Sequence, residues 1–153
     1  YAKAQLAAGN ELPTEGTVFI SVKDADKKRA VELARQLYRL GFKIVATKGT
    51  CMELINNNIP SEYVLKVKQG RPNIVDLIIN GDIDLIINTT VGKQSIIDSF
   101  SIRRSALDHA ITYVTTIRAG AAVTGAITAV KQKKVTVKSI QQYYRIARKG
   151  KKK

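Results

Sequence analysis

The sequence has few of the residues that disulfide-bonded, metal-binding or membrane-spanning proteins need. Cys51 is the single cysteine, so an intrachain disulfide cannot form. No histidine stands near Cys51 in the sequence, so we expect a small buried side chain there and no metal site. A signal-peptide pattern and an apolar run of about twenty residues are also missing. These absences predict a soluble protein of a reducing, cytoplasmic compartment, with no membrane partner.

Acidic residues are missing from the last part of the chain. No Asp or Glu follows Asp108, so the formal net charge of +14 is concentrated towards the C-terminal end. Residues 1–108 hold 15 basic and 12 acidic side chains, whereas the last 45 residues hold 11 basic ones. Clustered Lys and Arg can neutralise nucleic-acid phosphates, but a short run such as 148–153 is more often solvated. We therefore expect a basic tail over 148–153, and rank contact with nucleic acid or an acidic neighbouring domain below that.

Apolar residues follow strand and helix spacings in alternation. With 153 residues and 44% apolar content, the chain has room for one ordinary domain, preceded by a leader or linker at 1–16. Short β-branched runs predict strands at 17–22, 42–46, 63–67, 83–87 and 111–114. Helical spacing predicts helices at 24–40, from the turn 47–50 to about 57, at 73–80 and at 119–130, and a helical stretch that is broken near 99–101. The last two predicted elements are a strand at 135–137 and a helix at 140–147. Parallel strands need long crossovers, so we expect an α/β fold, a three-layer α/β/α sandwich around a mainly parallel five-stranded sheet.

Hydroxyl, amide and lysine side chains follow nearly every predicted strand. Ligands of parallel α/β sheets bind at this edge, where helix N-termini present unpaired N–H groups. The residues placed there are Ser21, Lys27, Thr47, Lys48, Gly49, Thr50, Lys66, Asn88, Thr89, Thr90, Gly92, Thr115 and Thr116. Each threonine alone could cap a helix, and Lys27 alone could be a solvated helix residue. Together, positive charge and directional donors predict a site for a compact phosphate monoester, with Asn88 available to a ribose hydroxyl.

Five segments carry a family resemblance. They are Ser21-Val22-Lys23-Asp24-Ala25-Asp26-Lys27, Ala46-Thr47-Lys48-Gly49-Thr50, Lys66-Val67-Lys68-Gln69-Gly70-Arg71-Pro72, Ile87-Asn88-Thr89-Thr90 and Ile102-Arg103-Arg104-Ser105-Ala106-Leu107. Over 17–137 the sequence resembles the C-terminal, allosteric domain of carbamoyl-phosphate synthase large subunits, which has the methylglyoxal-synthase-like fold. The resemblance implies a regulatory domain at 17–147 that binds UMP as an inhibitor and IMP as an activator, and that is not an enzyme in itself.

The same resemblance implies roles for individual residues. Those for the effector phosphate are Lys27, Thr47, Thr50 and Lys66. Those for its ribose and base are Asn88, Thr90, Asp98 and Thr116. Ornithine, a further activator in the family, would lie against Tyr113 and Thr115. Two positions depart from the pattern, because Lys48 replaces a common histidine and Val114 replaces the acid of ornithine-binding members. We therefore expect a cation to remain beside the phosphate, and ornithine to bind weakly or not at all.

The parent protein that the resemblance implies is a glutamine-hydrolysing, ATP-dependent ligase of pyrimidine and arginine biosynthesis. The partners of the domain would be the synthetase domains of the same polypeptide and the amidotransferase small subunit. Self-association through the domain is open. We expect no ATP, glutamine or metal site and no cofactor within this chain.

Two other functions stand as alternatives. Methylglyoxal synthase, a lyase of the same fold, acts on dihydroxyacetone phosphate and needs a carboxylate base and histidines. Its Gly-Gly-Asp motif is replaced here by Gly70-Arg71-Pro72-Asn73, the next carboxylate is Asp76, and the only histidine, His109, is expected to cap a helix or lie on the surface. A nucleic-acid-binding module would rest on the basic tail and Tyr143-Tyr144, without an RNA-recognition signature.

Overall fold

The computed structural model describes residues 12–90, 96–97, 99–132 and 141. Within these ranges, strands and helices alternate from Thr17 to Gln132, as the apolar pattern predicts. Several predictions lie outside the described residues. They are the site residue Asp98, the strand at 135–137, the helix at 140–147 except for Gln141, the tail at 148–153 and most of the leader at 1–16.

Five parallel strands form one sheet in the order β3-β2-β1-β4-β5. Their bounds are β1 Thr17–Ser21, β2 Lys43–Ala46, β3 Glu62–Tyr63, β4 Leu85–Asn88 and β5 Thr112–Val114. The chain runs outward from the central β1 through β2 to β3, and then returns to β4 on the other side of β1. This reversal of direction is a topological switch point, and it lies at the carboxyl end of β1.

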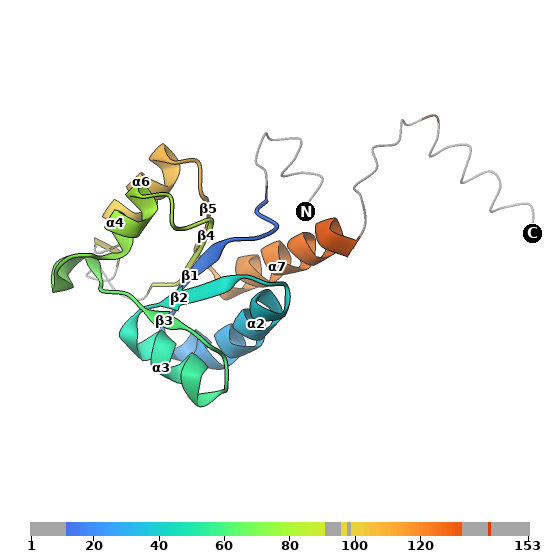
Figure 1. Cartoon of the computed structure of the whole chain (residues 1–153), viewed down its shortest axis with the longest axis horizontal. Coiled ribbons are helices and arrows are strands. Elements are labelled where there is room, and N and C mark those ends of the chain that lie inside the picture. The colour runs from blue at the N-terminus through green and yellow to red at the C-terminus, as the bar shows by residue number, and fades with distance from the viewer. Residues whose placement is uncertain (1–11, 91–95, 98, 133–140, 142–153) are drawn as a thin grey trace, which may run out of the picture.

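Helices cover both faces of the sheet (Figure 1). On one face lie α2 Lys27–Arg39, α3 Lys48–Asn56 and α7 Ile117–Gln132, and on the other lie α4 Ile74–Ile79 and α6 Phe100–Asp108. Two short 3-10 helices, η1 Asp24–Asp26 and η2 Val67–Gln69, lie in the loops after β1 and β3. The predicted three-layer α/β/α fold is confirmed, and every strand pair in the described sheet is parallel.

The core is split by the sheet into two apolar clusters, one under each helical layer. In β1, Val18 and Ile20 face α2, α3 and α7, whereas Phe19 faces α4 and α6, and all three are 0% exposed. A strand covered on both faces needs a continuous apolar run, which explains the sequence Val-Phe-Ile in the centre of β1. Close approach of α7 depends on Gly120, where an added Cβ would lie only 2.9 Å from Leu33 Cδ1.

The third strand differs most from its prediction. We predicted a strand at 63–67, but β3 ends at Tyr63, and only the Val64 N–H extends the ladder by donating to the Ala46 carbonyl at 3.0 Å. Leu65 pairs instead with Asn73 in a single bridge. Lys66 then precedes η2, where its carbonyl accepts from the Gln69 N–H at 2.8 Å. A local turn therefore replaces the end of the predicted strand, because backbone groups there bond within 66–69 instead of along β2.

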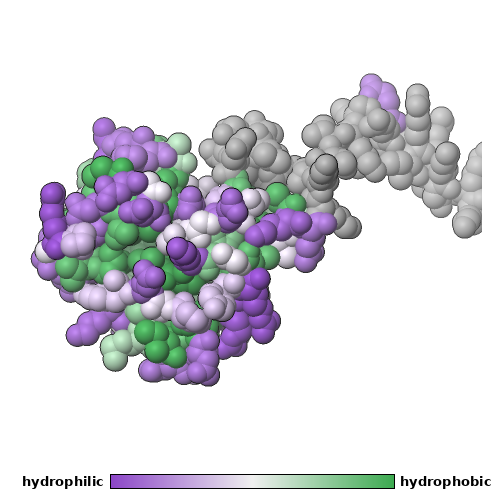
Figure 2. All heavy atoms as spheres, viewed as in Figure 1, coloured by the Kyte–Doolittle hydropathy of each residue, from purple (hydrophilic) through white to green (hydrophobic). Residues whose placement is uncertain are grey.

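The outer surface of α2 is hydrophilic (Figure 2). Its buried stripe consists of Ala30, Val31, Leu33, Ala34 and Leu37. The helix ends before Gly41, whose φ of 92° is accessible to glycine at little cost. Among the described residues, no helix has the length and apolar character that crossing a bilayer requires.

Candidate functional site

A cavity of about 850 Å³ opens at the carboxyl ends of β1, β2 and β4, at the switch point of the sheet. Its polar lining consists of Ser21, Lys23, Asp24, Lys27, Thr47, Lys48, Thr50, Lys66, Lys68, Gln69, Asn88, Thr89 and Ser99. An apolar wall is added by Phe19, Val67, Ile74 and Ile102, which belong to the α4 and α6 side of the core. The cavity therefore joins a lysine- and hydroxyl-rich side to an apolar side.

The N-terminus of α3 forms one wall of the cavity. Thr47, in the extended backbone conformation, is the N-cap residue, and its carbonyl accepts from the N–H groups of Thr50 and Cys51 at 2.9 and 2.8 Å. The Thr47 hydroxyl makes no capping bond and instead donates to Ser21 Oγ at 3.1 Å. The N–H groups of Lys48 and Gly49 therefore keep no partner within the helix, which is the arrangement that binds anions at helix N-termini.

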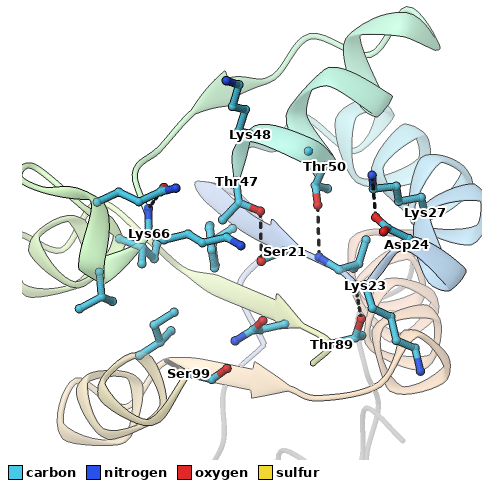
Figure 3. A pocket seen from close by; sticks show the side chains of 18 of the residues that line it. Ser21, Lys23, Asp24, Lys27, Thr47, Lys48, Thr50, Lys66, Thr89 and Ser99 are labelled. Atoms are coloured by element: carbon cyan, nitrogen blue, oxygen red, sulfur yellow. Dashed lines mark hydrogen bonds and ion pairs between the residues drawn. The ribbon is translucent and has the colours of Figure 1, made fainter. Parts of the chain in front are cut away.

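Two further hydroxyls hold the segment after β1 in place. Thr50 Oγ1 accepts from the Val22 N–H at 3.2 Å, and Thr89 Oγ1 accepts from the Lys23 N–H at 3.1 Å. A hydroxyl that accepts from the backbone still carries a hydrogen of its own to donate. Figure 3 shows Thr47 and Thr50 on one side of the β1 end and Thr89 and Ser99 on the other. The cavity thus has donors on both sides.

Lys27, the first residue of α2, lies beside the α3 N-terminus. Its Nζ is 2.8 Å from Asp24 Oδ1, and it would lie 3.5 Å from a Cβ placed on Gly49. Hydrogen bonding and charge from Lys27 hold the pKa of the Asp24 carboxyl below its ordinary value, although that carboxyl is open to solvent. Asp24 is therefore ionised at neutral pH, and the ammonium group retains further donors that can bind a phosphate.

Lys66 enters from the side of the cavity opposite Lys27 (Figure 3). Its backbone is fixed by the Gln69 side chain, whose Oε1 accepts from the Lys66 N–H at 3.0 Å. Lys68 of the same turn also lines the cavity. The turn that replaces the end of the predicted third strand therefore brings lysines to the cavity.

Asn88 is the last residue of β4 and is 3% exposed. Its Nδ2 donates to Tyr113 Oη at 2.8 Å, and Arg103 Nε donates to the same oxygen at 3.3 Å. Tyr113, predicted to lie in an ornithine region, thus has its hydroxyl against the cavity residue Asn88. Val114 is buried and packs towards the α2, α3 and α7 side.

The cavity brings together five of the predicted effector residues, Lys27, Thr47, Thr50, Lys66 and Asn88. Thr90 and Thr116 do not line it, and Asp98 is outside the described residues. The Thr116 hydroxyl accepts from the Ala119 N–H at 3.1 Å, as a helix cap does, and Thr115 is exposed beside it.

Ser21 and Thr89 line the cavity, at the strand ends where the sequence places them, although the resemblance gave them no individual role. Lys23 received no role, and it lies within a segment that carries the family resemblance. Ser99, at the start of α6, is marked in the sequence only by the predicted helix break, and only folding brings it to the cavity.

The residues considered for catalysis or metal binding have structural contacts. Asp76 Oδ2 accepts from the Asn73 N–H at 2.8 Å and so caps α4. His109 Nδ1 is 2.9 Å from the Ser105 carbonyl at the end of α6, which fits the predicted capping position. Cys51 is buried, as predicted, with Sγ 3.5 Å from the Ser61 carbonyl. No group of three or more metal-ligating His, Cys, Asp or Glu side chains occurs among the described residues.

Comparison with known proteins gives the same family for the whole domain. A family model described as the MGS-like domain matches residues 29–115. The chain is 50% identical over 145 residues to the carbamoyl phosphate synthase large chain of Archaeoglobus fulgidus and 52% identical over 143 residues to that of Myxococcus xanthus, in each case over 94% of this chain. It is 52% identical over 146 residues to the C-terminal section of the large chain of Methanopyrus kandleri.

The matched relatives are much longer than this chain. It spans 14% and 13% of the two large chains and 27% of the C-terminal section, while 95% of this chain is covered in the last comparison. The matching of a separate C-terminal section agrees with the expected position of the domain in such proteins. The chain belongs to the family of MGS-like domains, in the form found in carbamoyl phosphate synthase large chains.

Proposed function

We propose that this chain is the allosteric domain of a carbamoyl phosphate synthase large chain, and that its cavity binds a nucleoside monophosphate, with UMP as inhibitor and IMP as activator. The observation that carries the proposal is the α3 N-terminus, flanked by Lys27 and set within a cavity of about 850 Å³. That volume is in the usual range for small-molecule sites. The names of the relatives support placing this site in a carbamoyl phosphate synthase.

The phosphate would lie against the turn 47–50. The N–H groups of Lys48 and Gly49, the hydroxyl of Thr50 and the ammonium group of Lys27 converge there. Charge-assisted hydrogen bonds to a phosphate are stronger than neutral ones, and the helix N-terminus adds a partial positive charge. Lys66 would approach the same phosphate from the opposite side of the cavity.

The nucleoside would extend towards α4 and α6. That side provides the apolar side chains Phe19, Ile74 and Ile102, which suit the faces of a base, and the amide of Asn88, which suits a hydroxyl or a base edge. Five of the described lining residues are lysines, and Asp24 is the only carboxylate among them. This balance favours an anionic ligand.

The methylglyoxal synthase alternative receives less support. Asp24, the carboxylate that lines the cavity, is bound to Lys27, and this contact lowers the Asp24 pKa. The Asp24 carboxylate is therefore a weak base near neutral pH. Asp76 and His109 cap helices outside the cavity lining. For the nucleic-acid alternative, the basic tail lies outside the described residues, and the cavity lysines surround a compact concave site.

The proposed parent protein is an ATP-dependent, glutamine-hydrolysing ligase whose synthetase domains and amidotransferase subunit are the partners of this domain. Effector binding here would act on chemistry performed elsewhere in that assembly, so the domain would contain neither a catalytic centre nor a cofactor. An effector changes activity only through different affinities for two states of the assembly.

Thermal unfolding of the 153-residue chain at fixed salt tests the function. A ligand that binds the native state raises the midpoint by mass action, so UMP and IMP should stabilise the chain more than orthophosphate, dihydroxyacetone phosphate or a short oligonucleotide. Stabilisation by dihydroxyacetone phosphate alone, together with release of methylglyoxal, would favour the lyase. Stabilisation by the oligonucleotide alone would favour the nucleic-acid module.

A further inference from the structure

The Thr89 hydroxyl takes the place of a backbone carbonyl at the end of the ladder between β1 and β4. The Thr89 N–H donates to the Ser21 carbonyl at 2.9 Å, as in a regular parallel pair. In a continued parallel ladder the next donor, the Lys23 N–H, would bond to the Thr89 carbonyl. It donates instead to Thr89 Oγ1 at 3.1 Å. The chain therefore leaves the sheet after Ser21 while its backbone stays bonded to the end of β4.

Two hydroxyls hold the consecutive N–H groups that follow β1 from opposite sides (Figure 3). Val22 donates to Thr50 Oγ1 at 3.2 Å on the α3 side, and Lys23 donates to Thr89 Oγ1 on the β4 side. Thr89 is 6% exposed, and among the described residues its side chain makes no other hydrogen bond. Because Thr50 also faces the proposed phosphate position, Thr89 is the hydroxyl whose effect on this segment can be tested separately.

The 3-10 helix η1 carries this position on to Lys27. The Lys23 carbonyl accepts from the Asp26 N–H at 2.9 Å, and the Lys27 N–H donates to the Asp24 carbonyl. No residue of η1 is buried, and neither Lys23 nor Asp26, the N-cap residues of η1 and α2, makes a side-chain capping bond. The first buried residue of α2 is Ala30. The segment before Ala30 is therefore located by its backbone bonds and not by the burial of its own side chains.

We propose that Thr89 is a positioning residue for Lys27, and that its hydroxyl keeps the Lys27 ammonium group at the α3 N-terminus, where the effector phosphate would bind. The inference rests on the proposed function and adds to it a residue that acts without touching the phosphate. Lys27 Nζ would lie 3.5 Å from a Cβ placed on Gly49, so the ammonium group is already beside the N–H groups of that turn. A charge-assisted hydrogen bond spans about 2.7–2.9 Å, so a displacement of about 1 Å breaks it.

Thr89→Val tests this role, because valine keeps the shape of threonine and removes the acceptor. Calorimetry of the 153-residue chain should show UMP, IMP and ribose 5-phosphate bound about three- to tenfold more weakly, by the same factor for all three, since they share the phosphate. Thr89→Ser keeps the hydroxyl and should bind all three within about twofold of the wild type. Equal affinity in Thr89→Val and the wild type would overturn the inference. A loss for one nucleotide with ribose 5-phosphate unaffected would do the same.

Thr128→Val is the matched control. Thr128 Oγ1 also makes a hydrogen bond, donating to the Thr124 carbonyl at 2.8 Å, but it belongs to α7 and does not line the cavity. Thr128→Val should bind the three ligands as the wild type does, and the thermal midpoints of all variants show that the fold is retained. A loss of affinity in Thr128→Val as large as that in Thr89→Val would contradict a specific role for Thr89.

A double-mutant cycle with Lys27 separates positioning from a direct contact. Thr89 Oγ1 accepts from Lys23 but keeps a hydrogen of its own, which could donate to a ligand. If Thr89 acts through Lys27, Thr89→Val should change UMP affinity by less than about twofold in a Lys27→Ala background. Losses that add in free energy would refute the positioning role and leave the proposed function intact. Failure of the wild-type chain to bind any nucleotide would instead refute the proposed function, and the inference with it.

Discussion

Replacing Lys27 by alanine tests the phosphate position most directly. Lys27 is 25% exposed, and its ammonium group lies beside the α3 N-terminus while bound to the 94%-exposed carboxylate of Asp24. Because an ammonium group has three donors, Lys27 can bind a phosphate oxygen without releasing Asp24. A charge-assisted hydrogen bond contributes about 1.5–3 kcal/mol. Lys27→Ala should therefore weaken UMP binding by about ten- to a hundredfold.

The adjacent residue provides the control for this prediction. Lys28 is exposed on α2 and does not line the cavity, so Lys28→Ala removes the same charge without removing a contact. Calorimetry with UMP at fixed salt should give a wild-type dissociation constant for Lys28→Ala. Thermal midpoints of both variants should stay near that of the wild type, since an exposed ion pair contributes little to stability. Equal UMP affinity in the Lys27 and Lys28 variants would refute the phosphate position.

Four other changes have outcomes that the structure predicts. Gly49→Ala should raise the thermal midpoint slightly, because alanine has the higher helix propensity and its Cβ would be in ordinary contact 3.5 Å from Lys27 Nζ. Calorimetry should nevertheless show UMP binding weakened by about tenfold or more, because the methyl group covers the N–H groups at the α3 N-terminus. Asp24→Asn should strengthen UMP binding a few-fold. The gain should be the same at pH 5 and at pH 8, because Lys27 holds the Asp24 pKa below its ordinary value and the carboxyl is ionised at both. The stabilising ion pair with Lys27 is present above about pH 4 and is lost only as the pH falls through the lowered pKa. Gly120→Val should lower the free energy of unfolding in urea by about 1–3 kcal/mol, because α7 lies against its neighbours there. Ornithine should give little or no heat on titration, since buried Val114 offers no charge to an ammonium group, and an affinity comparable with that for UMP would contradict this.

The position of the cavity could be predicted because parallel strands present their carboxyl ends at one edge. Thr47 and Thr50 follow β2 and Asn88 ends β4, and both strands are adjacent to β1. The shared edge of the carboxyl ends therefore brings these residues together without knowledge of side-chain contacts. The sequence does not specify which strands are neighbours. The β5 strand lies at the edge of the sheet, next to β4, so Thr115 and Thr116 stand one strand further from the switch point than Asn88.

Residues contributed by turns were harder to predict than residues at strand ends. We placed Lys66 at the third strand end and took its phosphate role from the resemblance. The strand predicted around it, however, left no room for the 3-10 turn that brings Lys68 and Gln69 to the cavity. The contact of Tyr113 with Asn88 depends on strand register, and the contact with Arg103 depends on how α6 packs on β5. Neither register nor helix packing can be read from apolar spacing alone, because a strand covered on both faces is a continuous apolar run and stays buried in more than one register.

The arrangement of the cavity also bears on how two nucleotides of opposite effect could share it. UMP and IMP have the same ribose 5′-phosphate, and under the proposed function both would place it at the turn 47–50 and Lys27. Their bases differ in size and would lie against the α4 and α6 layer, near Ile74, Ile102 and Asn88. Coupling to a distant centre requires a difference in contacts between two states. Because the proposed phosphate contacts would be common to both ligands, an opposite sign of their effects would have to arise on the α4 and α6 side of the cavity.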